Sequence, residues 1–115
     1  MKVAPIDVDA IQISEMSGLD ATAVFWCDYG QHRGSVTITC YPSGRAWTAR
    51  FGGMPSDTIR EFFLCADADY LVNKLGYAPT LKERNTDMVY LRRIVDAVKA
   101  ALNVLRGSEA VTNRE

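Results

Sequence analysis

The sequence has little of what metal and redox sites need. It contains one histidine, His32, and three cysteines that form no Cys-X-X-Cys pair. Structural zinc sites combine several such ligands at close spacing, so none is expected. An odd number of unpatterned cysteines favours reduced, buried thiols, which are typical of a cytoplasmic protein. We therefore expect no metal, no cofactor and a location in the cytoplasm.

Long apolar runs and a strong charge are absent too. The chain has 115 residues, of which 48% are hydrophobic, and no stretch approaches the length that spans a membrane. The first residues lack the apolar run of a secretory signal. With 13 basic and 14 acidic residues the formal net charge is −1, which disfavours a dedicated nucleic-acid-binding domain. Length and composition predict one globular domain over residues 1–115.

The first half of the chain has the alternating, β-branched texture of strands. Four segments show this texture, and short turns join them: residues 8–14, 21–29, 35–41 and 45–51. Neighbouring parallel strands would need long crossovers, so the short joins predict an antiparallel meander. The strands are expected within about residues 8–52.

After residue 52 the sequence takes on the period of helices. Thr58 and Glu61 stand at capping-box spacing at the start of a first short helix. Asp67 and Gly76 suit the two ends of a second one. With a third helix following, the fold class is α+β: a four-stranded antiparallel meander sheet, then two short helices and one long C-terminal helix, within about residues 57–106.

The long helix is expected to begin at a cap on Asn85 or Thr86 and to end at Gly107, leaving residues 108–115 as a frayed tail. An apolar stripe follows it at helical spacing: Met88, Leu91, Val95, Val98, Leu102 and Leu105. The stripe is about 27 Å long at the helical rise, whereas an average strand is only about 17–20 Å long.

This mismatch leads to a prediction about assembly. The end of the stripe at Leu102 and Leu105 would lack cover within the chain, and two copies that pair there would form a homodimer. The alternative is a helix that lies diagonally across the sheet and buries the whole stripe within one chain.

The predicted strands carry more aromatic residues than one face of a sheet can bury. On the second strand Phe25, Cys27 and Tyr29 alternate with Val24 and Trp26, so the two sets point to opposite faces. Either this strand is covered on both sides, or an aromatic face is left for a partner. Interfaces favour Trp, Tyr and Arg, which gives the expected partner-binding set: Trp26, Tyr41, Arg45, Trp47 and Arg50.

No catalytic constellation stands out in the sequence. His32 lies in a Gly-bounded loop with only Gln31 and Arg33 beside it, where a solvent-exposed turn residue is the simpler interpretation. We therefore expect a protein that is not an enzyme. An enzyme would need a pocket that collects polar groups such as Asp28, His32 and Asp69 from separate segments.

Five short runs are distinctive together: Val36–Cys40, Ala46–Ala49, Gly52–Met54, Glu61–Phe63 and Asp69–Leu71. Over about residues 6–76 the chain resembles a group of short proteins from the early regions of temperate phages and prophages. The resemblance implies a small, non-essential phage product that acts in the host cytoplasm. Genes of this class often encode accessory or host-takeover factors, including inhibitors of bacterial defence systems.

Two functions of different classes are expected from these observations. The first is a non-catalytic phage accessory protein that binds a host or phage protein, with inhibition of a bacterial defence system as its role. The alternative is a nucleic-acid-binding accessory protein whose sheet aromatics stack on bases. A basic C-terminal helix would then contact phosphates through Arg92, Arg93, Lys99 and Arg106. The near-neutral charge makes nucleic acid the weaker of the two.

Overall fold

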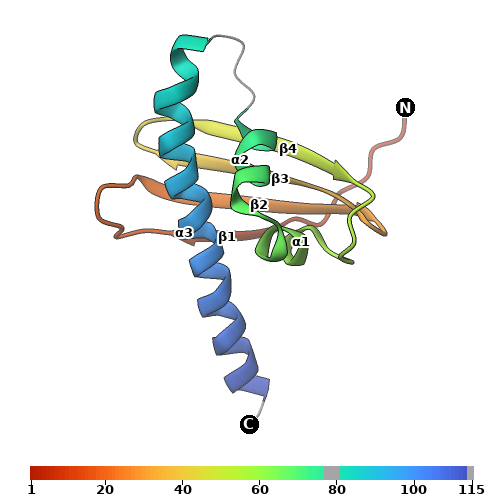
Figure 1. The fold of residues 1–115 in the computed structure, drawn as a ribbon. Coiled ribbons are helices and arrows are strands. Elements are labelled where there is room, and N and C mark those ends of the chain that lie inside the picture. The colour runs from red at the N-terminus through yellow and green to blue at the C-terminus, as the bar shows by residue number, and fades with distance from the viewer. Residues whose placement is uncertain (77–80, 114–115) are drawn as a thin grey trace. The chain divides into compact units, whose positions relative to one another are not determined.

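A computed structural model describes the backbone of residues 1–76 and 81–113 and the side chains of residues 1–76 and 88–107. In chain order the elements are β1 (Asp9–Ile13), β2 (Ala21–Gly30), β3 (Arg33–Tyr41), β4 (Ala46–Gly52), α1 (Ile59–Cys65), α2 (Ala68–Leu75) and α3 (Leu81–Asn113), as Figure 1 shows. The predicted α+β fold class is confirmed. The chain forms two compact units, Met1–Phe62 and Phe63–Glu115. The expectation of a single domain stays a prediction.

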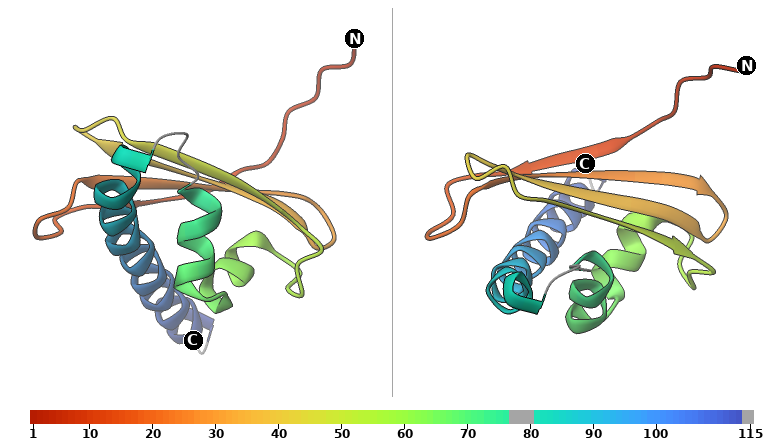
Figure 2. Two further views of the ribbon diagram at one scale, coloured as in Figure 1. Left: turned by 45° about the horizontal axis from the view of Figure 1, so that its top comes forward. Right: turned by 90° about the horizontal axis from the view of Figure 1, so that it is seen from above.

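The first unit contains the whole sheet. Its strands lie in the order β1-β2-β3-β4, and each neighbouring pair is antiparallel. This is the meander that the short joins predict, and Figure 2 shows it as one layer from two further sides. The central strands β2 and β3 are also the longest. At their shared turn they extend closer to each other than the sequence pattern indicated.

That turn replaces the loop predicted over residues 30–34. Only Gln31 and His32 remain between the strands, and His32 adopts a left-handed φ of 62°. The imidazole Nδ1 of His32 donates to the carbonyl oxygen of Ser56 at 3.1 Å, and the His32 carbonyl accepts from the N–H of Met54 at 2.9 Å. His32 is therefore half-buried and holds the segment before α1, instead of being the solvent-exposed turn residue that was expected.

The pairing register sorts the strand residues onto two faces, because residues directly opposite each other point the same way. One face, the buried face, carries side chains that are at most 8% exposed: Thr22, Val24, Trp26, Val36, Ile38, Cys40, Ala49 and Phe51. The other face, called here the open face, carries Phe25, Tyr29 and Tyr41 at 40%, 45% and 78% exposure. The aromatic residues of the strands are thus divided between the buried face and the open face, and those on the open face are exposed.

The start of α1 is fastened to the sheet by hydrogen bonds. The carboxylate of Asp28 accepts from the backbone N–H of Ile59 at 2.8 Å, and the Thr58 hydroxyl accepts from the N–H of Glu61 at 3.2 Å. The predicted cap at Thr58 is thereby confirmed. Two further contacts hold the same turn: the Arg60–Asp9 ion pair at 2.9 Å, and the Phe51 and Phe62 rings at 5.1 Å between centroids.

In the second unit both predicted ends of α2 are confirmed. The Asp67 carboxylate caps the helix by accepting from the N–H of Asp69 at 2.7 Å, and the N–H of Gly76 bonds to the Val72 carbonyl at 2.7 Å. Gly76 has a φ of −90°, so a left-handed conformation is not the reason for a glycine there. The reason is space, because an added Cβ would meet the sulfur of Met88 and would lie 2.8 Å from the Val72 oxygen.

The long helix differs from its predicted bounds. It begins at Leu81 and continues to Asn113, so Asn85, Thr86 and Gly107 lie inside it. A glycine costs a helix about 1 kcal/mol relative to alanine, which is not enough to end one when no proline follows. The predicted break at residues 77–80 and the last two residues of the predicted tail lie outside the described part of the chain. No helix within the described part combines the length and apolar character needed to cross a membrane.

The apolar stripe of α3 is buried over most of its length. Leu91, Val95 and Val98 are fully buried, and Leu102 is 2% exposed. Leu102 is therefore covered within its own chain, contrary to expectation, whereas Leu105 and, at the other end of the stripe, Met88 are half-buried. The helix buries a wider face than the stripe alone, since Ile94 is also 0% exposed. The homodimer through this end of the helix stays a prediction.

Candidate functional site

The open face presents three aromatic rings in a row. Phe25 and Tyr29 are four residues apart on β2, while Tyr41 of β3 pairs with Ala21, four residues before Phe25. At about 3.4 Å per strand residue, the row runs for about 27 Å along the sheet. All three rings are at least 40% exposed. The face therefore offers aromatic surface at regular intervals on a rigid support.

Small residues occupy the positions between the rings. Ala23 pairs with Thr39 on one side of Phe25, and Cys27 pairs with Ser35 on the other side. On the neighbouring strands the hydroxyl groups of Thr37 and Thr48 bond to each other at 3.1 Å, and Thr48 also donates to the Val36 carbonyl at 3.2 Å. The surface between the rings is therefore formed by small, uncharged side chains, and the two threonine hydroxyls are hydrogen-bonded to each other.

One end of the open face carries its charge. Here four residues form what we call the tyrosine–arginine cluster: Tyr29, Arg33, Ser35 and Arg50. The Tyr29 hydroxyl lies 3.0 Å from the Ser35 hydroxyl, and the Arg50 guanidinium lies over the Tyr29 ring at 5.0 Å from its centroid. A Cβ built on Gly30 would lie 3.2 Å from the guanidinium of Arg33. Among the described residues, no carboxylate pairs with Arg33 or Arg50.

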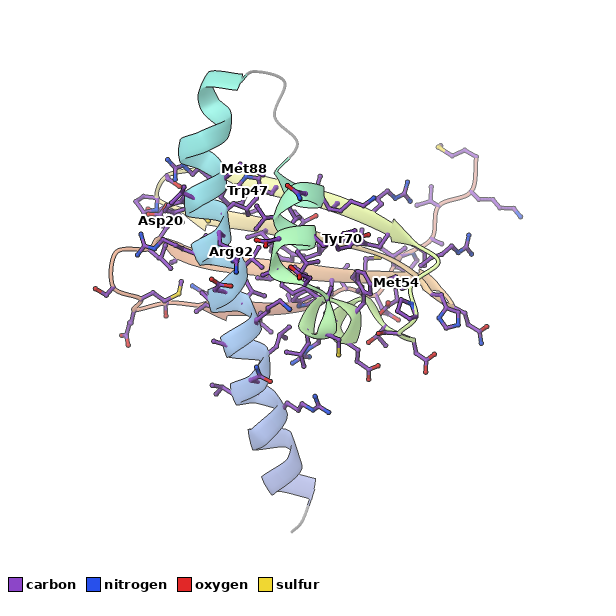
Figure 3. All side chains as sticks on the ribbon, viewed as in Figure 1. Asp20, Trp47, Met54, Tyr70, Met88 and Arg92 are labelled. Atoms are coloured by element: carbon purple, nitrogen blue, oxygen red, sulfur yellow. The ribbon has the colours of Figure 1, made fainter. Side chains whose placement is uncertain are left out.

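The predicted partner-binding set does not lie on one surface. Tyr41 and Arg50 are on the open face, but Trp26 and Trp47 (the latter labelled in Figure 3) are on the opposite one, where Trp47 pairs with Ile38. Trp26 is only 2% exposed and Trp47 is half-buried. Trp26 belongs to the core and leaves the contact set, because the alternation of the strand turns it away from Phe25. Arg45 lies in the turn that joins β3 to β4 and is half-buried. Its main-chain carbonyl accepts from the N–H of Cys40 at 2.8 Å.

Two residues of the open face were missing from the predicted set. Phe25 and Tyr29 alternate with Trp26 along β2, so the period-two pattern already placed them together on the other face. What the pattern alone did not settle is which of the two faces is buried. The preference for tryptophan at interfaces then selected Trp26, which lies on the buried face.

The basic residues of α3 are only partly available. Arg92 (Figure 3) bonds to the carboxylates of Asp69 and Asp96, in the latter case at 3.3 Å. The ammonium group of Lys99 donates to the main-chain carbonyl of Leu64 at 3.0 Å and also to the main-chain carbonyl of Ala66. Two of the four cations that were expected to contact phosphates thus have partners inside the second unit. The other two, Arg93 and Arg106, are exposed.

The polar residues considered for a catalytic pocket have structural partners. Asp28 accepts from the N–H of Ile59, His32 bonds to Ser56, and Asp69 pairs with Arg92. Asp28 and His32 belong to the first unit and Asp69 to the second. Within the described residues, no group of three or more His, Cys, Asp or Glu side chains is placed to hold a metal ion. The absence of catalysis stays a prediction.

The three thiols are free and differ in exposure. Cys27 and Cys40 are buried as expected, whereas Cys65, the last residue of α1, is exposed. Burial raises the pKa of the Cys40 thiol, although contact with the Thr22 hydroxyl at 3.8 Å partly opposes the shift. A raised pKa keeps this thiol protonated near neutral pH, so Cys40 is a small core residue and not an activated nucleophile.

Comparison with known proteins connects the chain to phages. The model of a phage family, Phage_phiTE_072, matches residues 1–87. No curated protein and no solved structure matches the chain. The matched range includes the complete sheet with its open face, both short helices and the first part of α3. It also confirms the resemblance to phage proteins that the strand and helix motifs suggested. The chain belongs to the Phage_phiTE_072 family of phage proteins.

Proposed function

We propose that this phage-family protein is a non-catalytic accessory protein that binds a host or phage protein through the open face of its sheet. The observation that supports the proposal is the row formed by Phe25, Tyr29 and Tyr41, each at least 40% exposed. Large aromatic residues and arginine are enriched where proteins bind one another. A sheet holds such rings in place before the partner arrives, which lowers the entropy lost on binding.

The energetics suit an interface of moderate strength. Full burial of a large apolar side chain contributes about 1.5–3 kcal/mol, so each exposed ring has about 1 kcal/mol still to gain from a partner. The hydroxyl groups of Thr37 and Thr48 already bond to each other, so covering them leaves no unsatisfied polar group. A complementary flat surface could therefore cover the face without a large desolvation cost.

A narrower form of the proposal concerns the role. Membership in a phage family supports action inside the host cell, and a component of a bacterial defence system is the partner that we propose. An inhibitor of this kind needs no catalytic group, because it acts by occupying a surface that its target requires. Nucleic-acid binding is the weaker candidate, since Arg92 and Lys99 are engaged within the second unit.

The proposal predicts a partner whose retention depends on the open face. Affinity-tagged protein produced in the bacterial host should retain one specific protein. The double variant Phe25→Ser, Tyr41→Ser should retain at least about tenfold less of it, because hot-spot rings carry most of the binding energy. Val89 and Val104 on α3 are exposed to 66% and 68%, so the matched double variant Val89→Ser, Val104→Ser should retain the wild-type amount.

Circular dichroism and denaturation of each variant would show that it is folded. The proposal fails if the open-face variant retains the partner as well as the wild type, or if retention is lost only in the α3 variant.

A further inference from the structure

We propose that the tyrosine–arginine cluster recognises an acidic segment of the protein partner. This inference rests on the proposed function and narrows the chemistry of the partner at one end of the open face. The motivating juxtaposition is Arg50 over the Tyr29 ring and Arg33 next to Gly30, with no carboxylate partner for either arginine among the described residues.

The pairing register fixes the relation between the two arginines. Arg33 pairs with Gly52 and Ser35 pairs with Arg50, so the arginines occupy diagonal positions on the same face of β3 and β4. Diagonal residues have Cβ atoms about 7–8 Å apart or somewhat closer. In an extended peptide, side chains two residues apart point the same way and are about 7 Å apart. Carboxylates at alternate positions of an extended segment therefore match the two guanidinium groups.

The charge of the face favours an anionic ligand. The strand residues that point to the open face include no aspartate or glutamate. The nearest strand carboxylates point to the buried face and are occupied: Asp9 pairs with Arg60, and Asp28 accepts from the N–H of Ile59. A guanidinium covered by a partner stays charged, so the partner must supply the carboxylate that the chain does not.

Three residues of the cluster, Tyr29, Ser35 and Arg50, are already in contact before binding. The Arg50 guanidinium lies over the Tyr29 ring at 5.0 Å from its centroid, and the Tyr29 hydroxyl is held by Ser35 at 3.0 Å. Arginine is suited to this arrangement because its planar fork can stack on a ring and still present donors to a carboxylate. The exposed ring of Phe25, four residues before Tyr29 on β2, gives an apolar contact for a residue of the segment beyond the acidic positions.

A protein segment fits this site better than a nucleic acid. Nucleic-acid affinity at physiological salt is built from many phosphate contacts, commonly about 6–10 in a well-studied binder. The open face supplies two arginines without a carboxylate partner, and the chain has a net charge of −1. Two arginines suit a short acidic motif.

The test uses the full chain and a labelled peptide of alternating glutamate and tyrosine residues, with fluorescence anisotropy at low salt. The wild type should bind it at least about tenfold more tightly than the matched peptide of alternating glutamine and tyrosine. The double variant Arg33→Gln, Arg50→Gln should lose at least about tenfold in affinity. The control variant Arg93→Gln, Arg106→Gln removes the same charge from α3 and should bind the acidic peptide as the wild type does.

Equal binding of the two peptides, or equal loss in the two double variants, would overturn the inference. It would also be overturned if a labelled oligothymidylate bound more tightly than the acidic peptide in the same assay. The affinity-tag experiment separates this failure from failure of the proposed function. A partner that is retained by the Arg33→Gln, Arg50→Gln variant but lost by Phe25→Ser, Tyr41→Ser would refute the acidic segment and leave protein binding intact.

Discussion

Replacing Trp26 with alanine should lower the free energy of unfolding by about 3–5 kcal/mol, the usual cost of truncating a large buried aromatic residue. Trp26 is 2% exposed and is the largest of the fully buried side chains. Its removal takes away apolar contacts and leaves a cavity that rigid strands cannot fill by collapsing. Since small domains have only about 5–15 kcal/mol of stability, the variant should unfold at markedly lower urea concentration.

The neighbouring residue provides a matched control. Phe25 is also aromatic and also on β2, but it is 40% exposed on the open face. Phe25→Ala should cost about 1 kcal/mol or less, because water already contacts much of the ring. Urea denaturation of both variants would reveal the difference. Equal losses of stability would contradict the assignment of the two faces.

Gly34→Ala is the second change with a large expected effect, a loss of about 1–3 kcal/mol from overpacking. An added Cβ would lie 2.7 Å from the Cβ of Ile59 and 3.0 Å from the carbonyl oxygen of Cys27. The carbonyl is part of the β2–β3 ladder and cannot move away easily. Ile59 would have to shift, which would strain the hydrogen bond between its N–H and Asp28.

Gly52 of β4 is the control for this substitution, since no atom lies within 4 Å of a Cβ built there. Gly52→Ala should change stability by no more than about 0.5 kcal/mol. Thermal denaturation followed by circular dichroism compares the two alanine variants directly. If Gly34→Ala melts at the same temperature as Gly52→Ala, the first turn of α1 does not pack closely against β3.

The order of elements could be predicted because it depends on local chemistry. Short joins between β-branched segments require an antiparallel meander, and the caps at Thr58 and Asp67 follow from side chains that accept nearby N–H groups. The end of α3 could not be predicted in the same way. Gly107 is a weak stop signal, and residues on both sides of it continue the helix.

The exposed face of the sheet was harder to predict for a different reason. Alternation divides Phe25 and Trp26 between two faces but does not say which face the rest of the protein buries. That choice depends on contacts between distant parts of the sequence. The same limit applies to Arg33 and Arg50, which are 17 positions apart and come together only through the register of β3 and β4. Residue type alone suggested Arg50 and gave no reason to add Arg33.

The most direct test of the open face as the partner-binding surface is site-specific photocrosslinking in the bacterial host. A photoreactive phenylalanine analogue would replace Phe25 or Tyr41 on the open face, and Val104 on α3 as the control, all of which are at least 40% exposed. We expect the same partner protein to be crosslinked from both open-face positions and not from position 104. Crosslinking from position 104 alone would contradict the proposed binding surface.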